Sequence, residues 1–166
     1  QVPVVGEGGH VSLSAADAVE EAVVAILRRR FGHVSAERAL SGPGLVNLYA
    51  ASCELAGRPI EPLDPPDVAD RARLGNDAGC RQAIDWFFAF LGSLAGDLAL
   101  TLGARGGIYI AGGIVAQLGD MIASSRFRER FEAKGRYAGY LARIPTAVVL
   151  DASALALRGA NAALDA

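Results

Sequence analysis

The chain has 166 residues, of which 52% are hydrophobic and 20% are charged, and its net charge at pH 7 is −2. These proportions are typical of a globular protein with one sizeable core, and they exclude an intrinsically disordered chain. Nucleic acid is not an expected partner, because neutralising its phosphates needs a clear excess of Lys and Arg.

The N-terminal residues resemble a segment from the interior of a longer protein. There is no initiator Met, and neither a basic segment nor a long apolar run marks a signal peptide. We therefore expect a fragment of a cytoplasmic protein. Alternation of apolar and polar side chains at 11–13 predicts a short strand.

A first helix is predicted directly after this strand. Ser14 is suited to cap it, with Asp17 three residues later in a capping-box-like position. Gly32 is a natural stop, and acidic residues early and arginines late match the helix dipole. The apolar face of this helix carries Val19, Val23, Ile26 and Leu27.

A second helix is predicted to begin at the sequence Ser-Gly-Pro-Gly at 41–44, because Pro43 suits the first helical position. The four prolines at 57–66 predict a loop. A brief helix at about 67–74 follows the loop, and Gly75 is expected to close it.

The clearest helical pattern covers Ala78–Leu102, where apolar side chains recur at intervals of three and four. Its apolar run is long enough to cross a bilayer, but Asp85 and Asp97 interrupt it, so we expect a buried helix and no membrane partner. Gly92 and Gly96 form a G-x-x-x-G spacing, which predicts close packing of another element. The aromatic residues expected to pack in the core here are Trp86, Phe87, Phe88 and Phe90.

The C-terminal third alternates strand and helix. Residues 106–114 predict a buried strand ending in a glycine turn, 146–150 a last strand, and 152–164 a last helix. Arginines at 126–136 alternate with Glu129 and Glu132, which predicts a solvated helical face. The whole pattern is that of an α/β protein, helix-rich, with a small incomplete sheet.

Cys53 and Cys80 lie far apart in the sequence and form no C-x-x-C pair, so no metal site is expected. The two could form one disulfide, but two half-buried, reduced thiols fit a cytoplasmic protein better.

The segment 6–10, Gly-Glu-Gly-Gly-His, is the first with ligand-binding chemistry. Its glycines let the backbone approach a ligand, Glu7 can accept two hydroxyl donors, and His10 can donate to another hydroxyl. Adjacent sugar hydroxyls need such a set of acceptors and donors. A tight turn with a solvated Glu also explains the segment, so by itself it leaves both interpretations open.

Four segments, in this order and spacing, resemble the bacterial glucokinase family. They are Glu-Gly-Gly-His at 7–10, His-Val-Ser-Ala-Glu-Arg at 33–38, Ser-Gly-Pro-Gly-Leu-Val-Asn-Leu-Tyr at 41–49 and Ile-Ala-Gly-Gly-Ile at 110–114. The resemblance extends over 6–161. It implies the hexokinase and actin-like ATPase (ribonuclease H-like) fold, of which residues 1–166 would be part of the larger, C-terminal domain, without the N-terminal domain.

The resemblance also implies site residues. The positions that match the family's glucose-binding residues are Glu7, His10 and Glu37. The positions that match the turn against the adenosine of ATP are Gly112, Gly113 and Ile114, and Ser41 and Gly42 are expected near the nucleotide too. A glycine pair suits that place, because a side chain would obstruct the flat base and ribose.

The family's reaction transfers the γ-phosphoryl group of ATP, bound with Mg²⁺, to the 6-hydroxyl of glucose, and a carboxylate accepts the hydroxyl proton. In the family this base is an Asp of the N-terminal domain. Neither a D-x-G-G-T-like hairpin nor a G-T-G-L-G-like loop occurs in the 166 residues. We therefore expect glucose and ATP contacts, no catalytic residue in this chain, and no kinase activity from it alone.

Two alternatives remain at this point. The related repressor and sugar-kinase group shares a Glu-x-x-His element, but it usually follows it with a cysteine-rich zinc motif that this chain lacks. A non-catalytic sugar-sensing module would keep the pocket without the catalytic half. Exposed sheet edges and apolar patches would favour a homo-oligomer, or association with a complementing N-terminal domain.

Overall fold

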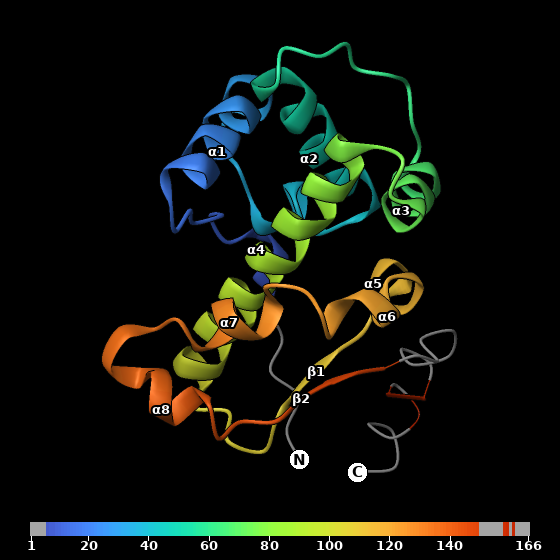
Figure 1. Ribbon diagram of the computed structural model, residues 1–166. Coiled ribbons are helices and arrows are strands. Elements are labelled where there is room, and N and C mark those ends of the chain that lie inside the picture. Colours follow the sequence, from blue (N-terminus) through green and yellow to red (C-terminus); the bar gives the residue numbers. More distant parts are fainter. Residues whose placement is uncertain (1–5, 150–157, 160, 162–166) are drawn as a thin grey trace.

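The computed structural model describes residues 6–149, 158, 159 and 161. In Figure 1 the long helix α4 (Ala78–Leu102) runs from an upper group of helices to a lower group of helices and strands. The upper helices are α1 (Ala18–Phe31), α2 (Gly42–Leu55) and α3 (Pro65–Leu74). After α4 come β1 (Ile108–Ile110), α5 (Gly113–Gln117), α6 (Gly119–Ile122), α7 (Phe127–Glu132), α8 (Ala138–Leu141) and β2 (Thr146–Val148). Three 3₁₀ turns complete the elements: η1 (Gly8–His10), η2 (Ala36–Arg38) and η3 (Gly135–Tyr137).

Helix α1 begins later than the sequence suggests. Asp17, not Ser14, is its N-cap, and the Asp17 carboxylate accepts a hydrogen bond from the backbone N–H of Glu20 at 2.8 Å. The prediction of Ser14 is wrong because the residues directly before it, 11–13, are bonded to the segment 34–36, and the chain turns into the helix only at Asp17. The predicted stop is confirmed, since Gly32 has a φ of 71°.

Helices α2 and α3 begin on side-chain caps. The Ser41 hydroxyl accepts from the Gly44 N–H at 3.0 Å, which confirms the predicted start of α2. Helix α3 starts two residues before the predicted position, because Asp64 and Asp67 form a reciprocal capping box around two N-terminal prolines.

Helix α4 is the core of the protein and has the predicted bounds. All four of its predicted core aromatics, Trp86, Phe87, Phe88 and Phe90, are buried. Among the described residues it is the helix whose length and apolarity would suit a membrane span, but 67% of its most apolar stretch lies buried inside the protein. Packing against α2, α3 and α7 accounts for its apolar composition.

The G-x-x-x-G spacing of α4 is the contact surface for α7, as predicted. A Cβ on Gly96 would lie 2.5 Å from the Phe131 carbonyl oxygen, and one on Gly92 would overlap the Phe127 carbonyl oxygen. The backbone of α7 therefore lies directly on α4, which only glycine at both positions permits.

The sheet is small, as expected. Strands β1 and β2 pair in parallel, with Ile108 opposite Thr146 and Ile110 opposite Val148. The strand expected at 11–13 is a single antiparallel bridge between Ser12 and Ser35 instead. The expected helix at 152–164 lies largely outside the described residues.

The arginine-rich segment differs from the expected solvated face. Arg130 is only 4% exposed and pairs with the buried Glu20. Arg128 donates hydrogen bonds to the carbonyl oxygens of Ala142 and Ile144, each at 2.9 Å, beyond the end of α8. Alternation of charge along the sequence could not reveal that α4 covers one side of α7.

The two cysteines are free, and both are fully buried rather than half-buried. Burial, aided by the Asp77 carboxylate, raises the pKa of the Cys80 thiol to about 12. Burial and a hydrogen bond to Cys53 raise the pKa of Tyr49 to about 12 as well. Cys80 and Tyr49 are therefore neutral at physiological pH and belong to the core between α2 and α4.

The α4–α7 contact predicts the effect of one methyl group. Gly92→Ala should lower the free energy of unfolding by about 1–3 kcal/mol through overpacking, although alanine favours a helix. Urea unfolding followed by circular dichroism measures it. Gly139→Ala is the control, since a Cβ there has no atom within 4 Å and should leave stability unchanged or raised. Equal stability of both variants would contradict the contact.

The thiols should be inert in the folded chain. At pH 8 iodoacetamide should alkylate neither Cys53 nor Cys80, because alkylation needs an accessible thiolate and the raised pKa keeps Cys80 protonated. Mass spectrometry should show both residues modified after addition of urea. Rapid labelling of Cys80 without denaturant would contradict its burial.

Candidate functional site

Two 3₁₀ turns that are distant in sequence meet beside the start of α2. The Ala36 N–H donates to the Val11 carbonyl at 2.8 Å, and the Leu13 N–H donates to the Val34 carbonyl at 2.9 Å. These bonds flank the bridge between Ser12 and Ser35 and place η1 against η2. The approach is close, since a Cβ on Gly9 would lie 3.8 Å from the Glu37 Cβ.

This arrangement joins two of the three predicted sugar-binding residues. The Nε2 atom of His10 lies 3.7 Å from Oε2 of Glu37, and both side chains are more than half exposed, at 65% and 57%. Glu7 precedes η1, and its carbonyl oxygen accepts from the His10 N–H at 2.9 Å. The Glu7 side chain is exposed. A carboxylate and an imidazole therefore face solvent together, free to exchange water for another hydroxyl ligand.

A cavity of about 330 Å³ adjoins this pair. Its lining residues are His10, Phe31, His33, Ser35, Glu37, Arg38, Ser41, Pro43 and Asn47. No site role was expected for His33, Arg38 or Asn47, although each lies inside one of the four segments that resemble the glucokinase family. The Asn47 amide donates to the Arg38 carbonyl at 3.0 Å, and His33 Nε2 lies 3.3 Å from the His10 carbonyl oxygen. These contacts shape the backbone that carries His10 and Glu37.

Ser41 connects the pair to a rigid helix. Its hydroxyl donates to the Glu37 carbonyl at 2.8 Å while it caps α2 through the Gly44 N–H. Gly44 must be small, because a Cβ there would lie 2.5 Å from the Ala39 carbonyl carbon. One side chain thus fixes η2 to the N-terminus of α2.

The second predicted group, Gly112, Gly113 and Ile114, lies where β1 passes into α5. Gly112 has a φ of 136°, which few other residues tolerate. A Cβ on Gly112 or Gly113 would meet no atom within 4 Å, so this turn presents open backbone to solvent. A flat ligand can lie against such a surface.

The glycine turn and the sugar-binding pair share α2 as a neighbour. The Cδ1 atom of Ile114 would lie 3.8 Å from a Cβ on Gly42, the first residue of α2. Gly42 therefore lies beside Ile114, and its expected place near the nucleotide stays a prediction.

Arg73 of α3 holds the far end of α5. It donates to the Gln117 carbonyl at 2.7 Å and to the Asp120 carboxylate at 3.2 Å. The hydrogen bond from Arg73 lowers the pKa of the Asp120 carboxyl below its ordinary value. The position of the glycine turn is thereby tied to the upper helices.

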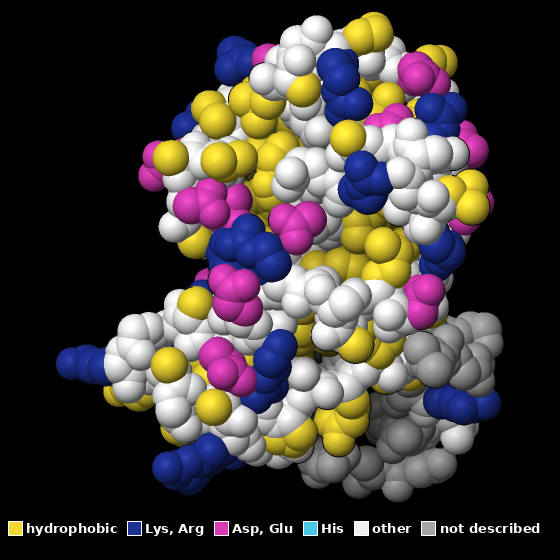
Figure 2. All heavy atoms as spheres, in the orientation of Figure 1, with side chains coloured by type: hydrophobic (Ala, Val, Ile, Leu, Met, Phe, Trp, Pro, Cys, Tyr) yellow, Lys and Arg dark blue, Asp and Glu magenta, His cyan; other side chains and the backbone are white. Residues whose placement is uncertain are grey.

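Within the part of the chain that the structure describes, no three His, Cys, Asp or Glu side chains gather in a way that could hold a metal ion. Basic and acidic side chains are interspersed over the face seen in Figure 2. The arrangement suits a neutral polyhydroxyl ligand at the His10–Glu37 pair and a flat ligand at the glycine turn.

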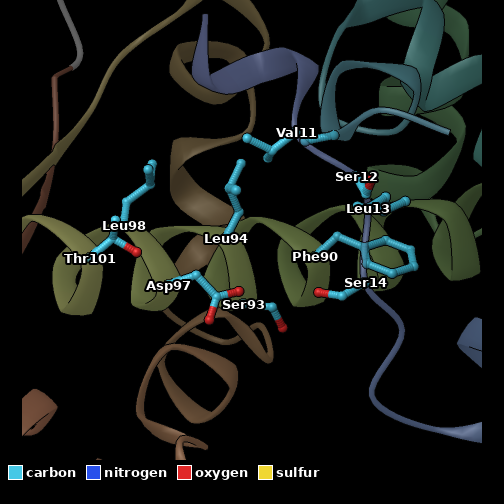
Figure 3. Close-up of a pocket in the computed structure, with 11 residues that line it drawn as sticks. Val11, Ser12, Leu13, Ser14, Phe90, Ser93, Leu94, Asp97, Leu98 and Thr101 are labelled. Atoms are coloured by element: carbon cyan, nitrogen blue, oxygen red, sulfur yellow. The ribbon is translucent and has the colours of Figure 1, made fainter. Parts of the chain in front are cut away.

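Another cavity, of about 290 Å³, is mainly apolar and lies along α4. Figure 3 shows Val11 of the N-terminal segment across from Leu94 and Leu98 of α4. Val11 is 45% exposed and Leu98 is 37% exposed. This groove offers few polar groups and is separate from the His10–Glu37 pair.

Comparison with known proteins gives one consistent result. The sequence model of the family described as Glucokinase matches residues 1–166. A glucokinase of Nitrobacter hamburgensis is 54% identical over 160 residues, which is 96% of this chain and 50% of that protein. The chain spans about half the length of the curated relatives it matches.

The similar solved structures are also glucokinases. The crystal structure of a glucokinase from an Antarctic psychrotroph is 38% identical, with a TM-score of 0.83, over 88% of this chain and 46% of that one. A glucokinase of Balamuthia mandrillaris in complex with glucose is 24% identical, with a TM-score of 0.68, over 86% and 42%. This likeness confirms the predicted fold class, a partial actin-like ATPase fold.

The contacts of Ser41 predict a measurable loss of stability. Ser41→Ala removes the cap of α2 and the hydrogen bond to Glu37, so the free energy of unfolding should fall by about 0.5–2 kcal/mol. Thermal unfolding is the measurement. Ser124→Ala, at an exposed hydroxyl that bonds only locally to the Met121 carbonyl, should change stability by less than about 0.5 kcal/mol. Indistinguishable variants would contradict the proposed link.

Proposed function

This chain belongs to the glucokinase family, and we propose that residues 1–166 form the C-terminal, larger-domain portion of an ATP-dependent glucose kinase. The observation that carries the proposal is the exposed pair of His10 and Glu37 beside a polar cavity. The family implies an enzyme that phosphorylates a hexose, and the glucose complex of the Balamuthia relative supports glucose as the ligand.

In this proposal Glu7, His10 and Glu37 hold the hydroxyl groups of glucose. Each carboxylate accepts from one or two hydroxyls, and the imidazole donates to or accepts from another. Hydrogen bonds between hydroxyls and a carboxylate are the stronger, charge-assisted kind. The open sides of His10 and Glu37 leave room for them.

ATP would lie against Gly112, Gly113 and Ile114. The empty space over both glycines supports contact with the base and ribose. ATP bound with Mg²⁺ supplies the phosphoryl group in the complete enzyme. No metal-binding cluster exists among the described residues, so the cation would be held by the nucleotide phosphates and by groups outside this chain.

The division of labour follows from the residues present. Glu7 and Glu37 act as sugar ligands, and the Asp that accepts the proton of the 6-hydroxyl lies on the N-terminal domain, outside these residues. This chain alone would be inactive, and a complementing N-terminal domain would restore phosphorylation. A homo-oligomer in the cytoplasm is part of the same proposal, supported by exposed apolar side chains such as Val11 and Leu98.

Glucose titration of the chain tests the proposal. Isothermal titration calorimetry should show weak binding to the 17.2 kDa chain, weakened on the order of tenfold by Glu37→Gln through loss of a charge-assisted hydrogen bond. Glu21→Gln, on the exposed surface of α1, is the matched control and should bind like the unaltered chain. If the unaltered chain and both variants bind glucose equally, Glu37 is not part of the glucose site.

A coupled assay for glucose 6-phosphate tests the division of labour. A chain with an intact mass of 17.2 kDa should produce none with ATP and Mg²⁺. The full-length protein should be active. Phosphorylation by the short chain would show that it contains the base. Sugar binding without activity in the full-length protein would favour the sugar-sensing alternative.

A further inference from the structure

A buried ion pair joins helices α1 and α7, whose paired residues are 110 positions apart in the sequence. Glu20 of α1 is fully buried, and Arg130 of α7 is 4% exposed. Arg130 forms a two-pronged contact with the carboxylate, with Nη1 2.5 Å from Oε1 and Nη2 3.0 Å from Oε2. Its Nη2 also donates to the Ser93 hydroxyl of α4 at 2.8 Å. Three helices therefore meet at this ion pair.

The same carboxylate holds the segment that leads to the sugar-binding pair. Oε2 of Glu20 accepts from the backbone N–H of Ala16 at 2.9 Å, one residue before the N-cap of α1. From Ala16 the chain runs back through Leu13 and Val11, which bond to Val34 and Ala36. Figure 3 shows Ser93 of α4 near the segment that carries Leu13 and Ser14.

We propose that Glu20, held by Arg130, is a positioning residue for the pair of His10 and Glu37. The inference rests on the proposed function for its link to glucose. Glu20 fixes Ala16, Ala16 limits the movement of the segment 11–15, and that segment forms the bridge between η1 and η2. Neither Glu20 nor Arg130 touches the cavity beside the pair.

Stability alone does not require this ion pair. A buried pair is often replaced by apolar side chains of similar size without loss of stability, because its desolvation offsets most of its attraction. The hydrogen bond to Ala16 is different, since an apolar side chain cannot provide an acceptor there. A positional role therefore depends on an acceptor at position 20 for the Ala16 N–H, whereas a purely structural role depends on filling the space.

Two double variants separate these roles. Glu20→Leu with Arg130→Met removes the charges and the acceptor for Ala16. Glu20→Gln with Arg130→Met removes the charges but keeps a carbonyl oxygen for Ala16. Single replacement of Arg130 is avoided, because an unpaired buried carboxylate would unfold the chain. Circular dichroism should show both double variants folded.

Glucose affinity is the first readout. Calorimetry should give a dissociation constant raised on the order of tenfold for the leucine variant, the size of one lost hydrogen bond, and less than about twofold for the glutamine variant. Equal affinities in both variants and the unaltered chain would overturn the proposal. Equal losses in both would also overturn it, because they would assign the effect to the charges.

Amide hydrogen exchange is the second readout and does not depend on glucose. The leucine variant should lose protection at Leu13, Ala16 and Ala36, and the glutamine variant should keep it. Unchanged protection in the leucine variant would overturn the positioning role. If the unaltered chain does not bind glucose while exchange behaves as expected, the proposed function fails and the positioning of the His10–Glu37 pair stands.

Discussion

The contact of α7 on α4 is the constraint on which the other long-range contacts depend. Because Gly92 and Gly96 carry no side chain, the backbone of α7 can lie on α4 itself. At this short separation Arg130 contacts both Ser93 of α4 and Glu20 of α1. Larger side chains at positions 92 and 96 would hold α7 away from α4. The buried carboxylate of Glu20 would then be unpaired, at a cost of several kcal/mol. The buried ion pair therefore depends on the two glycines.

Both candidate binding surfaces depend on the N-terminus of α2. Ser41 holds Glu37 from one side, and Gly42 lies beside Ile114 on the other. Phosphoryl transfer between a sugar and a nucleotide needs its two substrates side by side, since most of its catalysis is positioning. In the proposed function, a single helix start that contacts both surfaces would provide such a common reference.

Much of this architecture could be predicted from local sequence signals. Ser41, Gly32 and the apolar repeat of α4 specify their helix ends and faces because caps and periodicity act within a few residues. Arg130 could not be placed, since its burial depends on a carboxylate 110 residues away. The cap of α1 was missed for a similar reason: the bridge to Ser35 withdraws the segment with Ser14 from the helix. Glu7 and His10 stood out by their residue types in a glycine-rich segment, whereas Glu37 was found by family resemblance alone, and the role of all three stays a prediction.

The sugar-binding pair is carried by elements that cannot hold their own shape. Each of η1 and η2 is a three-residue 3₁₀ turn without a side-chain cap, and such turns contribute little stability themselves. Their geometry must come from neighbours: the bridge of Ser12 and Ser35, the hydroxyl of Ser41, and Ala16 held by Glu20. Ser41 caps α2, which packs on α4, and Ala16 is held by Glu20, which pairs with Arg130 of α7. The exposed, adaptable ends of His10 and Glu37 thus depend on a rigid interior, and changes far from the cavity should act on the pair through these three connections.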